Sequence, residues 1–215
     1  MTVHNASSPS RVLIFGGTFD PPHRAHVELP QAAARELGCE RIIYIPAAIN
    51  PLKASPDQPS PTPAHHRLAM LRLALDGVPN AEISTIELDR AGPSYTIDTL
   101  RGLHATASSA FLLIGADQAL DFHRWKDWRE ILNLATPAMM LRPPWTRSTF
   151  QAALRERYDA EEASQWQTRV LSTLPIVDVS ATEIRKRMAA GSTLNGLVDP
   201  RVEAYIRKNR LYGAG

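Results

Sequence analysis

The sequence predicts an α/β fold in which a doubly wound, Rossmann-like parallel sheet carries helices on both faces. Short apolar runs alternate with longer stretches of helical period, a rhythm typical of βαβ units. Several of these runs are almost continuously apolar, as strands buried on both faces of a parallel sheet are. The expected strands are Val12 to Phe15, Arg41 to Ile45, Glu82 to Leu88, Phe111 to Ile114 and Ala138 to Leu141.

Helix boundaries can also be predicted. Thr62-Pro63 offers an N-cap followed by proline at the first helical position, and Gly77 follows the periodic apolar run that begins at Leu68. Asp199-Pro200 repeats this start signal before the last predicted helix. A helix over residues 26–38 would contain Pro30, which removes a backbone donor and favours a kink unless it lies near the first turn.

The composition is that of a globular chain. Its 215 residues are 44% hydrophobic and 21% charged, which argues against intrinsic disorder and fibrous repeats. The formal net charge is only +2, so nucleic-acid binding through a broadly basic surface is not indicated. We expect one domain over residues 11–215, preceded by a disordered polar tail at residues 1–10.

Neither a membrane nor an oxidising compartment is indicated. The apolar runs fall short of the roughly 18 residues that a spanning helix needs, and the first ten residues lack the features of a secretory signal. Cys39 is the only cysteine, so neither an internal disulfide nor a cysteine-rich zinc site can form. We expect a cytoplasmic protein with no membrane partner, and the sequence leaves open whether it forms a homo-oligomer.

Two segments are expected to lie outside the regular elements. Residues 47–63 carry five prolines and one lysine, Lys53. We expect this segment to be a long surface loop, whose functional form would be a mobile lid. Residues 142–167 are expected to form an inserted loop and helix.

A glycine-rich motif follows the first predicted strand: Gly16-Gly17-Thr18-Phe19-Asp20-Pro21-Pro22-His23-Arg24-Ala25-His26. Ligands of open α/β sheets bind beyond the carboxyl ends of strands, where glycines let a phosphate approach bare backbone N–H groups. Two histidines three apart at the start of a helix can both donate to phosphate oxygens. By itself, the spacing also fits surface histidines or two metal ligands.

With four further blocks, this motif resembles the nucleotidyltransferases of the His-x-Gly-His superfamily, and within them the nicotinate mononucleotide adenylyltransferases. The resemblance runs from residue 11 to the C-terminus. The further blocks are Pro46 to Lys53, Ser94 to Leu100, Gly115-Ala116-Asp117 with Trp125, and Ser180 to Arg185.

The resemblance implies a role for each block. It implies that the catalytic residues are His23, His26, Lys53 and Arg185. It implies ATP contacts from Gly16, Gly17, Thr18, Phe19, Ala25, Gly115, Asp117, Ser180 and Thr182. It implies nicotinate mononucleotide contacts from Gly17, Lys53, Ser94, Tyr95, Thr96 and Trp125, with no metal ligands from the chain.

Each block alone also has a plainer interpretation. Ser180, Thr182 and Arg185 could converge on an anion or form an ordinary N-cap with a solvated arginine. Asp117, directly after a buried strand, could accept from ribose hydroxyls or cap a helix. Lys53 could be a solvated surface charge, and Trp125 could fill the core rather than stack on a base.

The chain departs from the family pattern at two points. Ala25 stands where the family has glycine between its histidines, which adds a methyl group where adenosine is expected. Asn50-Pro51-Leu52-Lys53 replaces Pro-Pro-His-Lys, so a histidine is missing from the expected lid. Neither change removes a phosphate ligand.

The expected reaction is transfer of AMP from ATP to nicotinate mononucleotide, giving nicotinate adenine dinucleotide and pyrophosphate in NAD biosynthesis. Mg²⁺ would enter bound to ATP, held mainly by substrate and water. One alternative is adenylyl transfer to nicotinamide mononucleotide or another phosphorylated acceptor. Others are a metal-dependent hydrolase built on His23, His26 and His65 or His66, and a nucleotide-binding regulator without catalysis.

Overall fold

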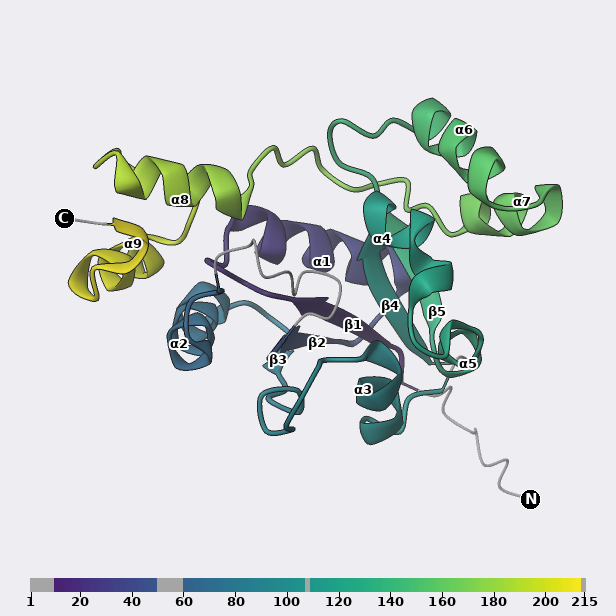
Figure 1. Ribbon diagram of the computed structural model, residues 1–215, viewed down its shortest axis with the longest axis horizontal. Coiled ribbons are helices and arrows are strands. Elements are labelled where there is room, and N and C mark those ends of the chain that lie inside the picture. Colours follow the sequence, from purple (N-terminus) through teal and green to yellow (C-terminus); the bar gives the residue numbers. More distant parts are fainter. Residues whose placement is uncertain (1–9, 50–59, 107–108, 214–215) are drawn as a thin grey trace, which may run out of the picture.

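The computed structural model describes residues 10–49, 60–106 and 109–213. In this part of the chain five parallel strands form one sheet in the order β3-β2-β1-β4-β5 (Figure 1). The strands are β1 (Val12–Gly17), β2 (Arg41–Pro46), β3 (Ala81–Ile83), β4 (Ala110–Gly115) and β5 (Thr136–Met140). The chain winds outward from β1 to one edge and then from β4 to the other, which confirms the predicted doubly wound fold.

Helices occupy most of the remaining described chain. Those before β5 are α1 (Arg24–Leu37), α2 (Ala64–Leu75), α3 (Thr96–Gly102), α4 (Ala116–Leu120) and α5 (Trp128–Leu134), with a 3₁₀ turn η1 at Phe122–Arg124. Those after β5 are α6 (Arg147–Arg157), α7 (Ala160–Thr168), α8 (Ala181–Ala189) and α9 (Pro200–Lys208), with a 3₁₀ turn η2 at Leu211–Gly213. The described helices include none long and apolar enough to cross a membrane.

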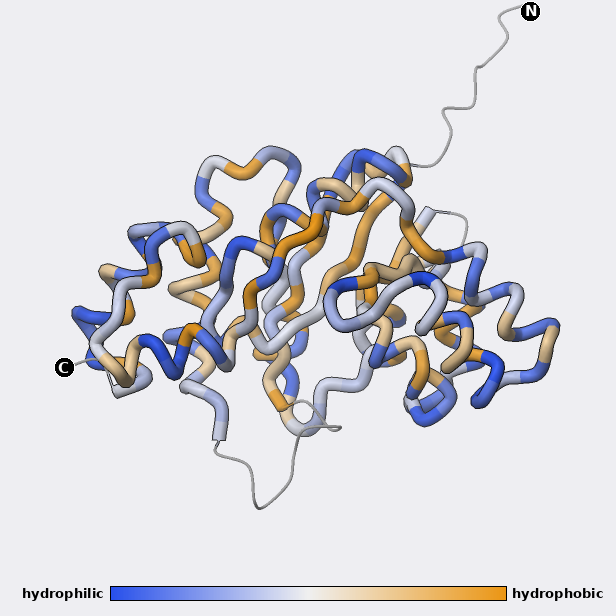
Figure 2. Tube along the Cα trace, turned by 90° about the horizontal axis from the view of Figure 1, so that it is seen from above, coloured by the Kyte–Doolittle hydropathy of each residue, from blue (hydrophilic) through white to orange (hydrophobic). Residues whose placement is uncertain are grey.

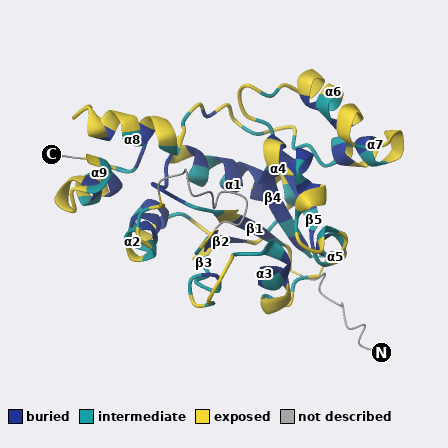
Figure 3. Ribbon diagram, viewed as in Figure 1, coloured by how far each residue is buried: buried dark blue, intermediate teal, exposed yellow. Residues whose placement is uncertain are grey.

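The sheet is buried on both faces because alternate strand residues enter two different apolar clusters. Leu13 and Phe15 pack with residues of α1 and α2, whereas Ile14 packs with residues of α3, α4 and α5. Figure 2 shows hydrophobic residues along the strands, and Figure 3 shows the strands largely buried between helices that are exposed on their outer sides. The almost continuous apolar runs therefore reflect burial from two sides.

A third apolar cluster joins the C-terminal part of the chain to α2. It is formed by buried residues of α2, α8 and α9, against which the partly buried Leu211 and Tyr212 pack. Figure 1 shows α8 and α9 at one end of the molecule and α6 and α7 at the other. The C-terminal helices thus pack beside α2 and not on the strands.

The predicted strand at residues 82–88 is wrong beyond Ile83. The Ser84 N–H still donates to the Tyr44 carbonyl at 2.9 Å, but Thr85 then begins a turn. Its carbonyl accepts from the Asp89 N–H at 2.9 Å, and its hydroxyl donates to the Asp89 carboxylate at 2.7 Å. Side-chain bonds of this kind compete with a strand ladder, and apolar letters alone did not reveal them.

Two predicted helix starts differ from the structure. Pro63, not Thr62, is the N-cap of α2, because both backbone polar groups of Thr62 bond elsewhere, to Asp20 and Arg67. The first helix begins at Arg24, so the buried Pro30 lies in its second turn. A missing backbone donor costs no helical hydrogen bond in the first turn, but Pro30 lies beyond that turn. The start at Asp199-Pro200 is confirmed, since the Asp199 carboxylate caps the Arg201 N–H at 2.8 Å.

The remaining segment predictions have mixed outcomes. Residues 142–167 hold two helices, α6 and most of α7, where one was expected. Most of the expected tail, residues 1–9, and most of the expected lid, residues 50–59 with Lys53, lie outside the described residues.

Candidate functional site

The glycine-rich motif forms a tight turn beyond the carboxyl end of β1. Gly16 and Gly17 are the last two residues of the strand, whereas the prediction ended the strand at Phe15 and placed both glycines in the following loop. Phe19 is 1% exposed and has a φ of 51°, a left-handed conformation that side chains seldom adopt. A Cβ on Gly17 would lie 3.0 Å from the Phe19 ring, so glycine allows the ring to fold back onto the strand end.

The two histidines lie against each other at the start of α1. Their rings stack with centroids 3.7 Å apart, and the His23 N–H donates to His26 Nδ1 at 3.2 Å. Because Nδ1 of His26 accepts, the hydrogen of a neutral ring must be on Nε2, which is the donor atom of the ring. Phe19 packs edge-on against the His26 ring at 5.0 Å and restricts its orientation.

His23 is a buried neutral group with unused hydrogen-bonding capacity. It is 3% exposed, and its Nδ1 has no hydrogen-bond partner among the described residues. Burial lowers the pKa of His23 to about 4, and the positive charge of Arg142 contributes to the lowering. Since buried polar atoms are nearly always satisfied, this nitrogen is a candidate contact for a ligand.

Arg142 is a site residue that the sequence reasoning missed. It follows Leu141 at the carboxyl end of β5, and its charge acts on His23. Its position just after a predicted strand was the one signal available, but the residue was assigned to an inserted segment. The structure brings it to the same edge of the sheet as the histidines.

The Ser180 to Arg185 block reaches the turn from α8. The Ser180 hydroxyl accepts from the Glu183 N–H at 3.2 Å, so this residue does cap the helix. Arg185 donates to the Asp20 carbonyl at 2.8 Å and to the Thr182 hydroxyl at 3.3 Å. The interpretation of Arg185 as a simply solvated side chain therefore does not hold, because it is bound to the histidine-bearing turn.

Asp117 lies beyond β4, which is the neighbour of β1 in the sheet. It is exposed in the first turn of α4, whose N-cap is Gly115, so Asp117 is not itself the cap. Its Oδ1 accepts from the indole N–H of Trp145 at 2.8 Å. A Cβ on Gly115 would only approach the Gln118 side chain at 3.8 Å, so the packing of the chain itself does not require glycine there.

The Ser94 to Thr96 segment starts α3 and is tied to the beginning of the proline-rich segment. The Ser94 hydroxyl accepts from the Ala48 N–H at 2.9 Å, and the Ser94 N–H donates to the Ile49 carbonyl at 2.8 Å. Tyr95 is the N-cap and Thr96 the first helical residue. Ser94 therefore joins two segments that both border the carboxyl edge.

Tyr95 and Lys126 are brought together although 31 residues separate them in the sequence. The Lys126 ammonium lies 4.7 Å from the centroid of the Tyr95 ring and 3.3 Å from an oxygen of Asp98. Trp125 is half-buried and packs against Phe122 with centroids 5.0 Å apart, and its indole N–H is buried without a partner in the described part of the chain. Part of its ring thus fills the core, and its polar atom has unused hydrogen-bonding capacity.

Ala25 is buried in the first turn of α1, so its methyl group is accommodated by the protein.

Gly16 is exposed, and Thr18 has a buried hydroxyl with no partner in the described residues. Lys53 lies outside the described residues. The structure thus brings most of the described members of the predicted set to one edge of the sheet, from β1, α1, α4, α8 and the segment that starts α3, while Trp125 lies between η1 and α5.

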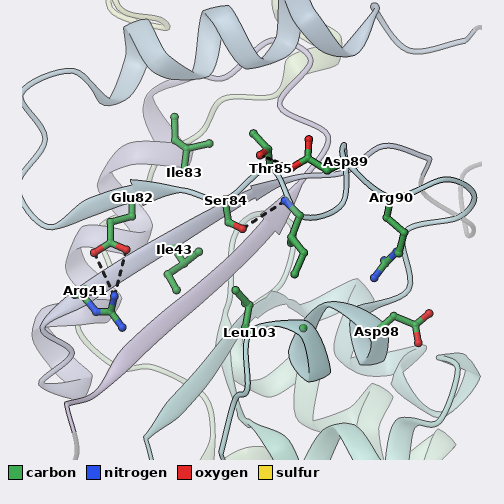
Figure 4. Close-up of a pocket in the computed structure, with 12 residues that line it drawn as sticks. Arg41, Ile43, Glu82, Ile83, Ser84, Thr85, Asp89, Arg90, Asp98 and Leu103 are labelled. Atoms are coloured by element: carbon green, nitrogen blue, oxygen red, sulfur yellow. Dashed lines mark hydrogen bonds and ion pairs between the residues drawn. The ribbon is translucent and has the colours of Figure 1, made fainter.

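A hollow of about 860 Å³ lies between β2, β3 and α3 (Figure 4). The close-up shows the Arg41–Glu82 ion pair and the Thr85–Asp89 hydrogen bond among its walls. None of the predicted site residues lines it.

The described residues contain no group of three or more His, Cys, Asp or Glu that could hold a metal ion. His65 and His66 lie side by side at the start of α2, with ring centroids 4.1 Å apart, and His66 Nδ1 is 2.9 Å from the Tyr205 hydroxyl. The ligand set that a hydrolase would require is therefore not assembled in this part of the chain.

Comparison with known proteins gives a consistent result. Residues 14–187 match the model of the cytidylyltransferase-like family. A protein of Chromobacterium violaceum named "probable nicotinate-nucleotide adenylyltransferase" is 37% identical over 212 residues, which are 94% of this chain and 99% of that protein. A protein of Bordetella petrii with the same name is 39% identical over 210 residues, covering 94% of this chain and 98% of that protein.

Solved structures show the same fold. Plasmodium falciparum nicotinic acid mononucleotide adenylyltransferase complexed with NaAD has a TM-score of 0.71 at 18% identity, covering 96% of this chain and 98% of that one. The same enzyme complexed with APC has a TM-score of 0.68 at 17% identity, with the same coverage. These likenesses extend along nearly the whole chain and agree with the doubly wound sheet.

Proposed function

This chain belongs to the nicotinate-nucleotide adenylyltransferases of the cytidylyltransferase-like family, and we propose that it transfers AMP from ATP to nicotinate mononucleotide in NAD biosynthesis. The products are nicotinate adenine dinucleotide and pyrophosphate. The observation that carries the proposal at the level of chemistry is the stacked His23–His26 pair beyond β1, with Arg185 bound to the same turn.

The reaction is a direct in-line displacement. An oxygen of the acceptor phosphate attacks the α-phosphorus of ATP, and the bond from that phosphorus to the β-bridging oxygen breaks, so pyrophosphate leaves with the electron pair. The ionised phosphate is already a nucleophile, so neither a general base nor a covalent enzyme intermediate is needed. Positioning and stabilisation of charge then supply the catalysis.

The phosphate groups meet donors from three elements. His26 offers its Nε2 hydrogen, and His23 is a buried neutral ring with an unused nitrogen. Arg185 from α8 and Arg142 beyond β5 add positive charge at the same edge. Lys53 is proposed to reach the triphosphate as well, on the strength of the sequence resemblance.

The rest of ATP is assigned to the adjacent strand ends. Backbone of Gly16 to Phe19 and the first turn of α1 at Ala25 border the nucleotide, and Ser180 with Thr182 lies near its phosphates. Asp117, oriented by the Trp145 indole at 2.8 Å, accepts from ribose hydroxyls beyond Gly115.

Nicotinate mononucleotide is assigned to the side of the edge that holds Ser94, Tyr95, Thr96 and Trp125, with Gly17 between the two substrates. The Asp98 carboxylate beside this side is paired with Arg101 at 3.4 Å and Lys126 at 3.3 Å, so it does not stand as a free acceptor for an amide. Positive charge and unpaired donors favour the carboxylate of nicotinate over a carboxamide.

Nucleotidyltransferases of this kind generally use a divalent metal, and Mg²⁺ enters here as part of the MgATP substrate. Such an ion is held mainly by phosphate oxygens and water, so it needs no cluster of protein carboxylates. We further propose a single domain over residues 11–215 in the cytoplasm, with ATP and nicotinate mononucleotide, and not nucleic acid or membrane, as its partners.

The test is pyrophosphate release with MgATP and a panel of acceptors: nicotinate mononucleotide, nicotinamide mononucleotide, phosphopantetheine and glycerol phosphate. We expect kcat/KM for nicotinate mononucleotide to exceed that for the amide by about tenfold to a hundredfold, the cost of leaving one buried donor unpaired. Equal values would overturn the acceptor while leaving adenylyl transfer standing. Absence of pyrophosphate release with every acceptor would favour the alternative of a nucleotide-binding regulator without catalysis. Metal analysis of the purified protein would test the alternative of a metal-dependent hydrolase.

A further inference from the structure

A buried arginine of another element, helix α2, donates a hydrogen bond to the turn that carries the histidines. Arg67 of α2 is 1% exposed, which is exceptional for a charged side chain. Its Nη1 donates to the Thr18 carbonyl at 2.7 Å, and its Nε donates to the Thr62 carbonyl at 2.8 Å. The guanidinium thus connects the end of β1 to the residue before the N-cap of α2.

Asp20 lies at the centre of the same network. It is 9% exposed, and its Oδ2 accepts from the Thr62 N–H at 3.0 Å. Its Oδ1 accepts from the Tyr212 hydroxyl at 2.6 Å, across 192 residues of sequence. Its carbonyl accepts from Arg185 at 2.8 Å, so one residue meets the segment before α2, helix α8 and the C-terminal turn.

Tyr212 is brought to Asp20 by an unusual backbone conformation. It has a φ of 57° within η2, which is costly for a residue with a side chain. Burial raises the pKa of Tyr212 above its ordinary value, and the hydrogen bond to Asp20 raises it further, so the hydroxyl stays protonated and donates. Apolar packing of Leu211 and the α9 stripe would hold the C-terminus to α8 without this hydroxyl.

We propose that Tyr212 and Arg67 are positioning residues for adenylyl transfer, which hold Asp20 and Thr18 so that His23, His26 and Arg185 are aimed before ATP binds. Buried charged groups are weak contributors to stability, because desolvation offsets their attraction. Here Arg67 donates to the Thr18 carbonyl of the histidine turn, and Tyr212 donates to the Asp20 carboxylate of the same turn. Such support matters most where a small displacement of donors costs rate.

This inference rests on the proposed function, because its main readout is turnover. The chain offers a matched control: Tyr205 of α9 is a second partly buried tyrosine with a hydroxyl at 2.9 Å from a side chain, His66, outside the site. Tyr212→Phe and Tyr205→Phe each remove one hydroxyl and keep the ring.

The experiment compares the two variants with the wild type in steady-state kinetics, at a temperature where melting curves show all three folded. We expect Tyr212→Phe to lower kcat/KM for ATP about tenfold, with KM for nicotinate mononucleotide within about twofold, and Tyr205→Phe to change neither beyond about twofold. In an Arg185→Ala background the effect of Tyr212→Phe should shrink below about threefold, because both act on the same turn. A merely structural role would instead lower the melting temperature, leave ATP kinetics like those of the control and show no coupling to Arg185.

Two further measurements keep the outcomes distinct. Asp20→Asn retains the size of the side chain and one acceptor oxygen. Its decrease in kcat/KM for ATP should not add to that of Tyr212→Phe. Asp20→Asn is used in place of Tyr212→Phe if that variant does not fold. Calorimetric ATP affinity decides the positioning role without turnover. If the wild type binds ATP but releases no pyrophosphate, the proposed function fails, and a weaker affinity in Tyr212→Phe alone still supports the positioning role. Equal affinity and equal kinetics in both tyrosine variants would overturn the inference.

Discussion

The two sides of the carboxyl edge are built in different ways. On the side proposed to bind the ATP phosphates, here called the phosphate side, Asp20, Arg67 and His23 are buried, and their contacts link positions 42, 49 and 192 residues apart. On the side proposed to bind nicotinate mononucleotide, here called the acceptor side, Tyr95 is bordered by ion pairs between partly exposed side chains, Lys126 with Asp98 and Arg101 with Glu130. Buried bonds are little screened by salt, whereas exposed pairs are worth at most about 1 kcal/mol and weaken as salt rises.

The difference indicates where the protein places its rigidity. Charge develops on the transferred phosphoryl group, and donors fixed in a dry site stabilise that charge most effectively. The acceptor side has to distinguish one ring substituent from another, which weaker and more adjustable contacts can do. We therefore expect large effects on turnover from the phosphate side and small, salt-dependent effects on acceptor KM from the other.

The largest effect is expected from His26→Ala. Losing one preorganised donor to the transition state should lower kcat by about a hundredfold or more, with a smaller change in ATP affinity. The measurement is pyrophosphate release at saturating substrates. His65→Ala, an exposed histidine of α2, is the control and should retain wild-type turnover. Near-wild-type kcat in folded His26→Ala protein would contradict the role of His26 and would show that the rigid phosphate side does not carry the chemistry.

His23 should make the phosphate side sensitive to acid. Its pKa is about 4 in the fold against 6.5 for an ordinary histidine, so the unfolded chain takes up the proton first as the pH falls. The contribution is intact above pH 6.5 and is lost between pH 6.5 and 4, a decrease of about 3 kcal/mol in the free energy of unfolding. Urea unfolding from pH 7.5 to 4 should show this decrease in the wild type and in His65→Gln, and a smaller decrease in His23→Gln. Parallel curves for all three proteins would contradict the burial of a neutral His23.

Arg185→Ala should weaken ATP binding more than acceptor binding. A guanidinium paired with phosphate is among the stronger polar contacts, so KM for ATP should rise about tenfold or more while KM for nicotinate mononucleotide stays within about twofold. Arg187→Ala on the same helix removes an exposed partner of Glu183 and serves as the control. If the acceptor KM rose instead, the two sides of the edge would have been assigned in reverse.

The smallest effect is expected on the acceptor side, from Lys126→Met. Removing the ammonium above Tyr95 should raise KM for nicotinate mononucleotide by about threefold at low salt and by less at high salt, with kcat unchanged. Lys186→Met, on exposed α8 surface, is the matched control. A loss of kcat as large as that of His26→Ala would show that the acceptor side is as rigidly coupled to the chemistry as the phosphate side.

Much of the phosphate side could be predicted from local sequence. The strand before the glycine-rich motif, the histidines three apart and the Ser180 cap are contiguous patterns whose geometry follows from strand and helix periods, although the strand runs on through Gly16 and Gly17. The strand prediction failed at residues 84–88, where side-chain bonds of Thr85 and Asp89 form a turn inside an apolar-looking run. Thr62 failed as an N-cap for a related reason, since its backbone groups bond to Asp20 and Arg67, which no local rule takes into account.

The sequence by itself determined the parallel sheet, the family and the glycine–histidine motif proposed to bind phosphate, because these depend on residues close together in the chain. Only the tertiary structure decided that Arg142 acts on His23, that Lys126 lies over Tyr95 and that Tyr212 bonds to Asp20. Those pairs join segments 31 to 192 residues apart. Their contact depends on how the helices pack around the sheet, and a single sequence carries no periodicity that records it.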